Sequence, residues 1–271
     1  MANLIIHKDV YNTTLLLQEG KSVSPRKAQV TITTLLGIVI IFVVTSLSFL
    51  YQYQLQAKQQ LEPTVMLPLY VQEVYSYVLS CVRNIAPVGI AMLGTQSGYY
   101  EKPPFPLNTQ ETTLAYYIIK NESHVPSSEE IGYQLALMIE DTLPVCTDFS
   151  RFPSLLIKPA DQDVNVLVRE NDVLVKVNYP LAIVKGAQTV NLNEPYTVTL
   201  PVRLKKIHQE VSAIVRKDLL QQGAYDLVFL LNTGLDVALI PYNEHTVIYA
   251  VTDASSQING IPYTFIFANE K

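Results

Sequence analysis

The amino-acid sequence predicts an α+β protein in which a long N-terminal transmembrane and stem helix precedes an extracytoplasmic domain of helices and antiparallel strands. Two observations support this fold class. An uncharged apolar run occupies residues 30–50, and the apolar period changes from helical to alternating in the second half of the chain. We expect a cytoplasmic leader over residues 1–28, a membrane and stem helix over 29–61, and the α+β domain over 62–271.

The run over residues 30–50 contains neither a charged residue nor a proline. As a helix that rises about 1.5 Å per residue, it spans roughly the 30 Å of a bilayer's hydrocarbon. Arg26 and Lys27 stand directly before it, which places the N-terminus in the cytoplasm and the C-terminal part outside. Residues 51–61 lack glycine and continue the helix as a stem until Pro63. The sequence thus predicts a single-pass protein of the cell membrane, with the lipid bilayer as a partner.

The junction Lys27-Ala28-Gln29-Val30-Thr31 resembles the class III signal peptide of archaeal type IV pilins. In that family a prepilin-type peptidase cuts on the cytoplasmic side, and the retained helix packs with like subunits into a filament. The resemblance implies processing between Ala28 and Gln29, with that peptidase and further subunits as partners. Ala28 stands where the family usually has glycine, and Thr33 stands where it often has an acidic residue.

The domain is similar to an uncharacterised family of membrane-anchored proteins from small-genome archaea that carry pilin-like N-termini. The matching pieces are Ser80-Cys81-Val82-Arg83, Gln96-Ser97-Gly98-Tyr99-Tyr100, Tyr116-Tyr117, Pro126-Ser127-Ser128-Glu129-Glu130, and Ile258-Asn259-Gly260-Ile261-Pro262-Tyr263 before Phe265 and Phe267. This resemblance spans most of residues 66–268 and implies no activity.

Three stretches of the domain have the period of an amphipathic helix: residues 68–93, 128–143 and 202–222. Pro87 lies inside the first stretch and is expected to kink or break it. Ser127, with Glu130 three residues later, forms a capping box before the second. Gly223 ends the third. The polar side of the third stretch carries Arg203, Lys205, Lys206, Arg216 and Lys217. We expect this side to be a solvated face, with an anionic-lipid or partner surface as the alternative.

Extended segments make up most of the remaining domain. The expected strands cover residues 114–119, 164–168, 173–177, 181–185, 189–192, 196–202, 236–241, 246–252 and 263–268. Residues 169–172 join the second and third of these as a hairpin turn. Asn243-Glu244 and Asn259-Gly260 turn the last three strands.

The chain contains two cysteines, Cys81 and Cys146. Outside the cytoplasm an even number favours a disulfide, and the alternative is two buried free thiols. A bridge between them would join the first two helices, which favours a packing role over redox chemistry. Asn121-Glu122-Ser123 is a glycosylation sequon in an expected exposed loop on the outer side, although such sequons also occur by chance.

The sequence indicates no catalytic residue, cofactor or metal site. Its four histidines, at positions 7, 124, 208 and 245, are scattered, and no phosphate-binding loop or nucleophile motif occurs. Asp161 and Asp163 bracket Gln162 like half a calcium site but lack the glycine and distal glutamate of such loops, so a solvent-facing turn is expected. Glu140-Asp141 is likewise expected to be solvated. A net charge of −5 does not suggest the basic face that binding to nucleic acid requires.

Two non-enzymatic functions remain open from the sequence. The first is a pilin-like cell-surface subunit, processed at Ala28–Gln29 and anchored or assembled through its N-terminal helix. The alternative is an uncleaved single-pass anchor that carries an extracytoplasmic binding or adhesion domain. An ectoenzyme would require a buried polar cluster brought together by the fold.

Overall fold

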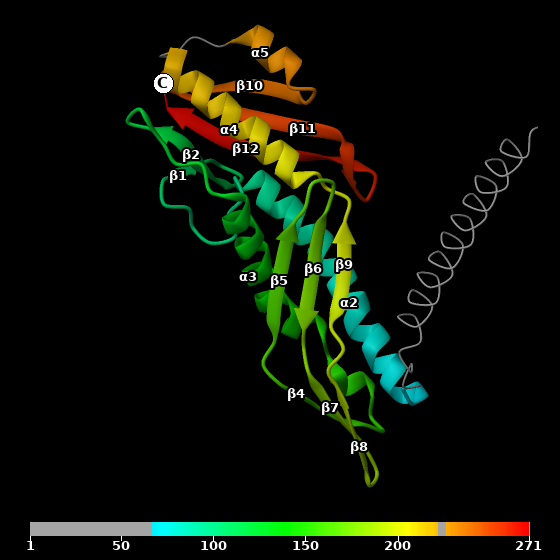
Figure 1. Cartoon of the computed structure of the whole chain (residues 1–271). Coiled ribbons are helices and arrows are strands. Elements are labelled where there is room, and N and C mark those ends of the chain that lie inside the picture. The colour runs from blue at the N-terminus through cyan, green and yellow to red at the C-terminus, as the bar shows by residue number, and fades with distance from the viewer. Residues whose placement is uncertain (1–66, 222–225, 271) are drawn as a thin grey trace, which may run out of the picture. The chain divides into compact units, whose positions relative to one another are not determined.

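The computed structural model describes residues 67–221 and 226–270, which belong to one compact unit beginning at Leu67 (Figure 1). The described chain is α+β, and all but one of its strand pairings are antiparallel. The expected leader, the membrane and stem helix, the Ala28–Gln29 bond and Gly223 lie outside the described residues. These assignments stay predictions.

The first helix, α2, runs from Leu69 to Thr95 and is the spine of the unit. It contacts helix α3 as well as strands from all three sheets, namely β12, β9 and β8. Within the described residues, α2 is also the helix that is long and apolar enough to cross a membrane, but half of its most apolar window is buried inside the unit. The buried contacts identify it as a core helix.

Pro87 lies within α2, and the helix continues beyond it to Thr95. Of the expected kink or break at Pro87, the break is therefore wrong. Proline removes one intrahelical hydrogen bond. The buried residues on both sides of it, Ile85 and Ile90, pack in the core and hold the helix together across that loss.

Helix α3 spans Ser128–Cys146 and begins at the expected cap. The Ser127 hydroxyl accepts a hydrogen bond from the Glu130 N–H at 3.1 Å. The Glu130 carboxylate accepts from the Gln134 side chain at 3.0 Å, so the serine half of the predicted capping box is formed.

The larger sheet has the strand order β1-β2-β12-β11-β10, with β3 beside β2. Its strands are β1 (Pro106–Asn108), β2 (Thr113–Ile119), β3 (Glu122–Ser123), β10 (Asp236–Asn243), β11 (Thr246–Ile258) and β12 (Ile261–Glu270). β11 and β12 form a long hairpin turned by Asn259 and Gly260, which both have positive φ. β12 also pairs with β2 in parallel.

Two three-stranded sheets complete the unit, in the orders β4-β7-β8 and β5-β6-β9. Their strands are β4 (Leu156–Pro159), β5 (Asp163–Val168), β6 (Val173–Asn178), β7 (Leu181–Lys185), β8 (Gln188–Leu192) and β9 (Tyr196–Leu200). The alternating valines of β6 are fully buried, which confirms the hairpin that the sequence predicts between β5 and β6.

Two further helices follow the small sheets, α4 (Leu204–Gln221) and α5 (Leu227–Asn232). In Figure 1, α4 lies along one face of the larger sheet. Arg203, Lys205 and Lys217, at the start and on the polar side of α4, pair with Asp253, Glu170 and Asp226. The expected solvated face is therefore in part a set of ion pairs that join α4 to its neighbours.

Candidate functional site

A groove separates α2 from the tip of the β11–β12 hairpin, and we call it the α2 groove. It has a volume of about 640 Å³. It is lined by Pro87, Val88, Ala91, Met92 and Thr95 of α2, and by Ile258, Asn259, Ile261, Pro262, Tyr263 and Thr264 of the hairpin. Most of these side chains are apolar, and two large ones at the rim, Val88 and Ile261, are 58% and 69% exposed. A concave apolar surface of this size is within the range of ligand sites.

The α2 groove continues into a second hollow of about 390 Å³, which we call the edge hollow. Its lining comprises Arg83 and Pro87 of α2, residues 197–200 of strand β9 with Pro201 directly after the strand, and Gln257, Ile258 and Asn259 of the hairpin. Pro87, Ile258 and Asn259 line both hollows and so join them. Arg83 is the one charged residue in the two linings, and its side chain is exposed.

The wall formed by α2 follows from the helical period, which places residues 88, 91, 92 and 95 on one side of the helix. On another side Gly89 packs against α3, where an added Cβ would lie 2.7 Å from the Met138 sulfur. Pro87 has no N–H, so the carbonyl of Arg83 lacks the donor that a helix would supply four residues later. Arg83 is a lining residue of the edge hollow and brings a guanidinium to it.

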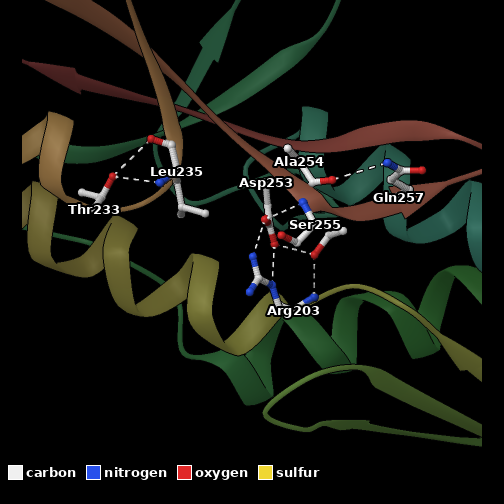
Figure 2. A network of polar contacts seen from close by, with 8 residues as sticks. Arg203, Thr233, Leu235, Asp253, Ala254, Ser255 and Gln257 are labelled. Atoms are coloured by element: carbon white, nitrogen blue, oxygen red, sulfur yellow. Dashed lines mark hydrogen bonds and ion pairs between the residues drawn. The ribbon is translucent and has the colours of Figure 1, made fainter.

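The hairpin wall is held by a network around Asp253, at the point where the register between β11 and β12 shifts. The Arg203 side chain donates to the Asp253 carboxylate from Nε at 2.9 Å and from Nη2 at 2.6 Å. The Ser256 hydroxyl and the Ser255 N–H also donate to it, at 2.6 and 3.0 Å. The Arg203 N–H donates to the Ser256 hydroxyl at 2.9 Å. Figure 2 shows Arg203 reaching Asp253 from the start of α4.

This network fixes the charge of Asp253, whose residue is only 2% exposed. Burial by itself disfavours the carboxylate, but the hydrogen bonds from Arg203, Ser256 and the Ser255 N–H outweigh it and lower the pKa of Asp253 to about 2. Asp253 and Arg203 therefore form an ion pair at neutral pH that connects the hairpin to α4. We call this network the Asp253 clasp.

The two walls meet at Gly94, near the end of α2. A Cβ at Gly94 would lie 2.5 Å from the Thr264 carbonyl oxygen and 2.9 Å from the Tyr263 hydroxyl. Tyr263 is buried, and burial raises the pKa of its hydroxyl. Within the described residues this hydroxyl has no hydrogen-bond partner. Only glycine permits so close an approach of the hairpin backbone to the helix.

A second carboxylate, that of Asp218, belongs to the C-terminal half of α4 and is half-buried. Asp218 accepts hydrogen bonds from the Tyr249 hydroxyl and from the Asn269 side chain, the latter at 2.8 Å. Desolvation outweighs both bonds and raises the pKa of Asp218. Residues 67–221 and 226–270 contain no group of three or more histidine, cysteine or acidic residues that could hold a metal ion.

Cys81 of α2 and Cys146 at the end of α3 lie at disulfide distance, with their Cα atoms 5.8 Å apart. This geometry agrees with the pairing expected from the sequence. Asn121 is exposed in the tight turn between β2 and β3, where it has a φ of 62°. Its glycosylation stays a prediction, as does the processing of Ala28–Gln29.

The structure does not bring the other residues considered from the sequence into one site. The ring of His124 lies against Phe105, whereas His208 contacts the Pro126 carbonyl. The Asp163 carboxylate accepts from the Asn178 side chain.

The expected solvation of Glu140-Asp141 is incomplete. Glu140 accepts from the Val164 N–H at 3.0 Å and so connects α3 to β5. Asp141 accepts from the Tyr100 hydroxyl at 3.1 Å and connects α3 to the loop before β1.

The sequence did not reveal the α2 groove. Asn259-Gly260 located the tip of the hairpin, but no local pattern places that tip beside residues 87–95, which lie more than 160 positions earlier. The helical stripe of residues 88, 91 and 92 gives a partial signal, because it continues the apolar character of α2 onto a side that the core does not need. No protein family, curated protein or solved structure matches this chain.

Proposed function

We propose that this chain is a non-enzymatic cell-surface protein that displays a binding domain. In this proposal the N-terminal helix anchors the chain in the cell membrane, and the described unit lies on the outer side. The observation that carries the proposal is the Cys81–Cys146 pair at disulfide distance. Disulfides persist mainly outside the cytoplasm, which agrees with the orientation expected from Arg26 and Lys27.

The α2 groove supports binding as the role of the displayed domain. It is concave and mostly apolar, and Arg83 is the one charge near it. Catalysis by acid and base requires paired titratable groups within reach of one substrate. The groove offers recognition chemistry instead, namely apolar contact, backbone edges and one cation.

The proposal takes the pilin-like subunit as the form in which the domain is displayed. Cleavage between Ala28 and Gln29 would leave a mature chain that begins with Gln29 and its apolar helix, as in the family that this junction resembles. An uncleaved chain would instead be a single-pass anchor with the same outer domain.

Mass spectrometry of the N-terminal peptide from native membranes tests the mode of anchoring. We expect a chain that begins at Gln29, and an Ala28→Leu variant with a bulky side chain before the bond should retain Met1. Finding only Met1 in the unaltered protein would remove the subunit assignment. Protease added to intact cells tests the display itself: we expect the C-terminal domain to be degraded, and a protected domain would overturn the proposal.

A further inference from the structure

We propose that the domain binds an extended peptide, which adds as a strand to the free edge of β9. In this complex a carboxylate of the peptide pairs with Arg83, and an apolar side chain enters the α2 groove. The inference rests on the proposed function, because it names the ligand class of the displayed domain. Three features of the described residues support it: an unpaired strand edge, a hollow along that edge, and the character of the lining.

Strand β9 is the last strand in the order β5-β6-β9. One edge pairs with β6 from Val173↔Leu200 to Val177↔Tyr196. Tyr196 and Leu200 are buried and hold the strand against the core, whereas Thr197 and Thr199 are exposed. In the described part of the chain, no other strand pairs with the outer edge of β9. Unpaired N–H and C=O groups along an edge are a template for a further strand.

The hollow follows this edge rather than a single face of the strand. Five consecutive residues, 197–201, line the edge hollow. Because successive side chains of a strand point to opposite faces, an unbroken run of lining residues places the hollow beside the backbone. Arg83 and Pro87 of α2 form the opposite side, and Figure 1 shows β9 running alongside α2. A peptide strand laid here extends the β5-β6-β9 sheet at its outer edge and passes beside Arg83 and Pro87 of α2.

The lining specifies what such a peptide would carry. Arg83 makes no ion pair with any described residue, and the rest of the lining is neutral. A carboxylate is a peptide group that a guanidinium binds strongly, through two parallel hydrogen bonds. The α2 groove and the edge hollow share three lining residues, Pro87, Ile258 and Asn259. Val88 and Ile261 are exposed in the α2 groove. A Val, Ile or Leu side chain further along the peptide fills this groove.

The backbone edge distinguishes a peptide from other occupants of an apolar groove. A lipid chain or small apolar molecule would leave the outer edge of β9 unpaired, whereas an extended peptide pairs it and gains main-chain hydrogen bonds. A second copy of this chain could offer its own β9 edge. In such a dimer, the Arg83 of each copy would meet a lining that contains no carboxylate. The unpaired positive charge therefore favours a separate peptide that carries an acidic residue.

The test uses the full chain in lipid nanodiscs and fluorescently labelled peptides of eight residues. The parent peptide alternates Val and Thr, and its relatives carry one Asp at each position in turn. A further relative has N-methyl groups on alternate amides, which removes one edge of donors without changing the side chains. We expect saturable binding that N-methylation weakens at least about tenfold, because strand addition depends on main-chain donors.

Two variants and one control variant separate the contribution of the Arg83 charge from that of the α2 groove. We expect one Asp position to bind at least about fivefold more tightly than the parent peptide. Arg83→Gln should remove this preference, and Arg216→Gln, which alters an exposed arginine of α4, should keep it. Ala91→Phe fills the α2 groove and should weaken all the peptides about tenfold. Unchanged unfolding midpoints serve as the folding control, and the Arg83 comparison suffices if Ala91→Phe does not fold.

Several results would overturn the inference. These are the absence of saturable binding for every peptide, equal binding of the N-methylated peptide, and an Asp preference that survives Arg83→Gln. Concentration-dependent dimerisation that Ala91→Phe abolishes would assign the edge to a second copy instead. The N-terminal mass and the protease digestion of intact cells are independent of these results, so surface display can fail or stand separately.

Discussion

The two walls of the α2 groove are held in place by different chemistry. The α2 wall belongs to a helix that is buried along one side and joined to α3 by the Cys81–Cys146 pair. The hairpin wall is a strand tip whose position depends on the Asp253 clasp to Arg203. We therefore expect the stability of one wall to respond to reductant and that of the other wall to respond to acid.

The largest expected effect comes from the α2 wall. The double variant Cys81→Ser with Cys146→Ser should lose about 4 kcal/mol of unfolding free energy, because the pair closes a loop of 65 residues in the unfolded chain. Urea unfolding with and without reductant measures the loss, and the double variant itself should not respond to reductant. If the variant and the oxidised protein unfold at the same urea concentration, the Cys81–Cys146 disulfide is not formed.

The next largest change in unfolding free energy is expected at Gly94, where the two walls meet. Gly94→Ala should cost about 2 kcal/mol, since the new Cβ meets a backbone carbonyl that cannot rotate away. Gly89→Ala on the same helix is the matched control. Its Cβ meets the flexible ends of Met138 and Leu135, and alanine favours helix, so its unfolding free energy should stay within about 1 kcal/mol of wild type. Equal losses in the two variants would contradict the close approach at Gly94.

Acid should weaken the hairpin wall. The folded-state pKa of Asp253, about 2, is below its unfolded value of about 3.9, so its contribution is present above pH 4 and is lost as the pH falls toward 2. The expected loss is about 2 kcal/mol, measured by urea unfolding at pH 4 and at pH 2. Asp253→Asn should flatten this pH dependence. The same slope of unfolding free energy against pH in both proteins would contradict the Asp253–Arg203 ion pair as its source.

Asp218 should give a pH dependence of stability opposite in sign to that of Asp253. Its pKa is raised in the folded state, so its contribution is present below about pH 4 and is lost as the pH rises through the folded value. Asp218→Asn keeps an acceptor for Tyr249 and should remove this decline between pH 4 and pH 7. Unfolding curves at those two pH values measure it, and a decline of the same size in the variant would assign it to another group.

The comparison of the walls also shows what the sequence can and cannot predict. Local patterns located the hairpin wall, because Asn259-Gly260 is a strong turn signal and the flanking strands alternate. They also located α2 and the alternating valines of β5 and β6. Periodicity does not distinguish a strand from a helix in short apolar runs such as Leu156–Pro159 (β4) and Leu227–Asn232 (α5).

Tertiary relations account for the remaining differences. The parallel pairing of β2 with β12 joins segments about 150 residues apart and leaves no mark on either one. Packing on both sides of Pro87 outweighs the one hydrogen bond that proline removes, so α2 continues through it. The Asp253 clasp arises from a register shift between β11 and β12, which turn signals alone do not reveal.

The central claim is that α2 serves as a scaffold on its buried side and as a recognition surface on its groove side. Val82→Ala and Val88→Ala make the same change on these two sides, since Val82 is 0% and Val88 is 58% exposed. We expect Val82→Ala to cost about 2 kcal/mol in urea unfolding and to leave affinity for the acidic peptide unchanged. Val88→Ala should change stability by less than about 0.5 kcal/mol and weaken peptide binding about threefold. Similar losses of stability in both variants, or peptide affinity that follows stability in both, would contradict the claim.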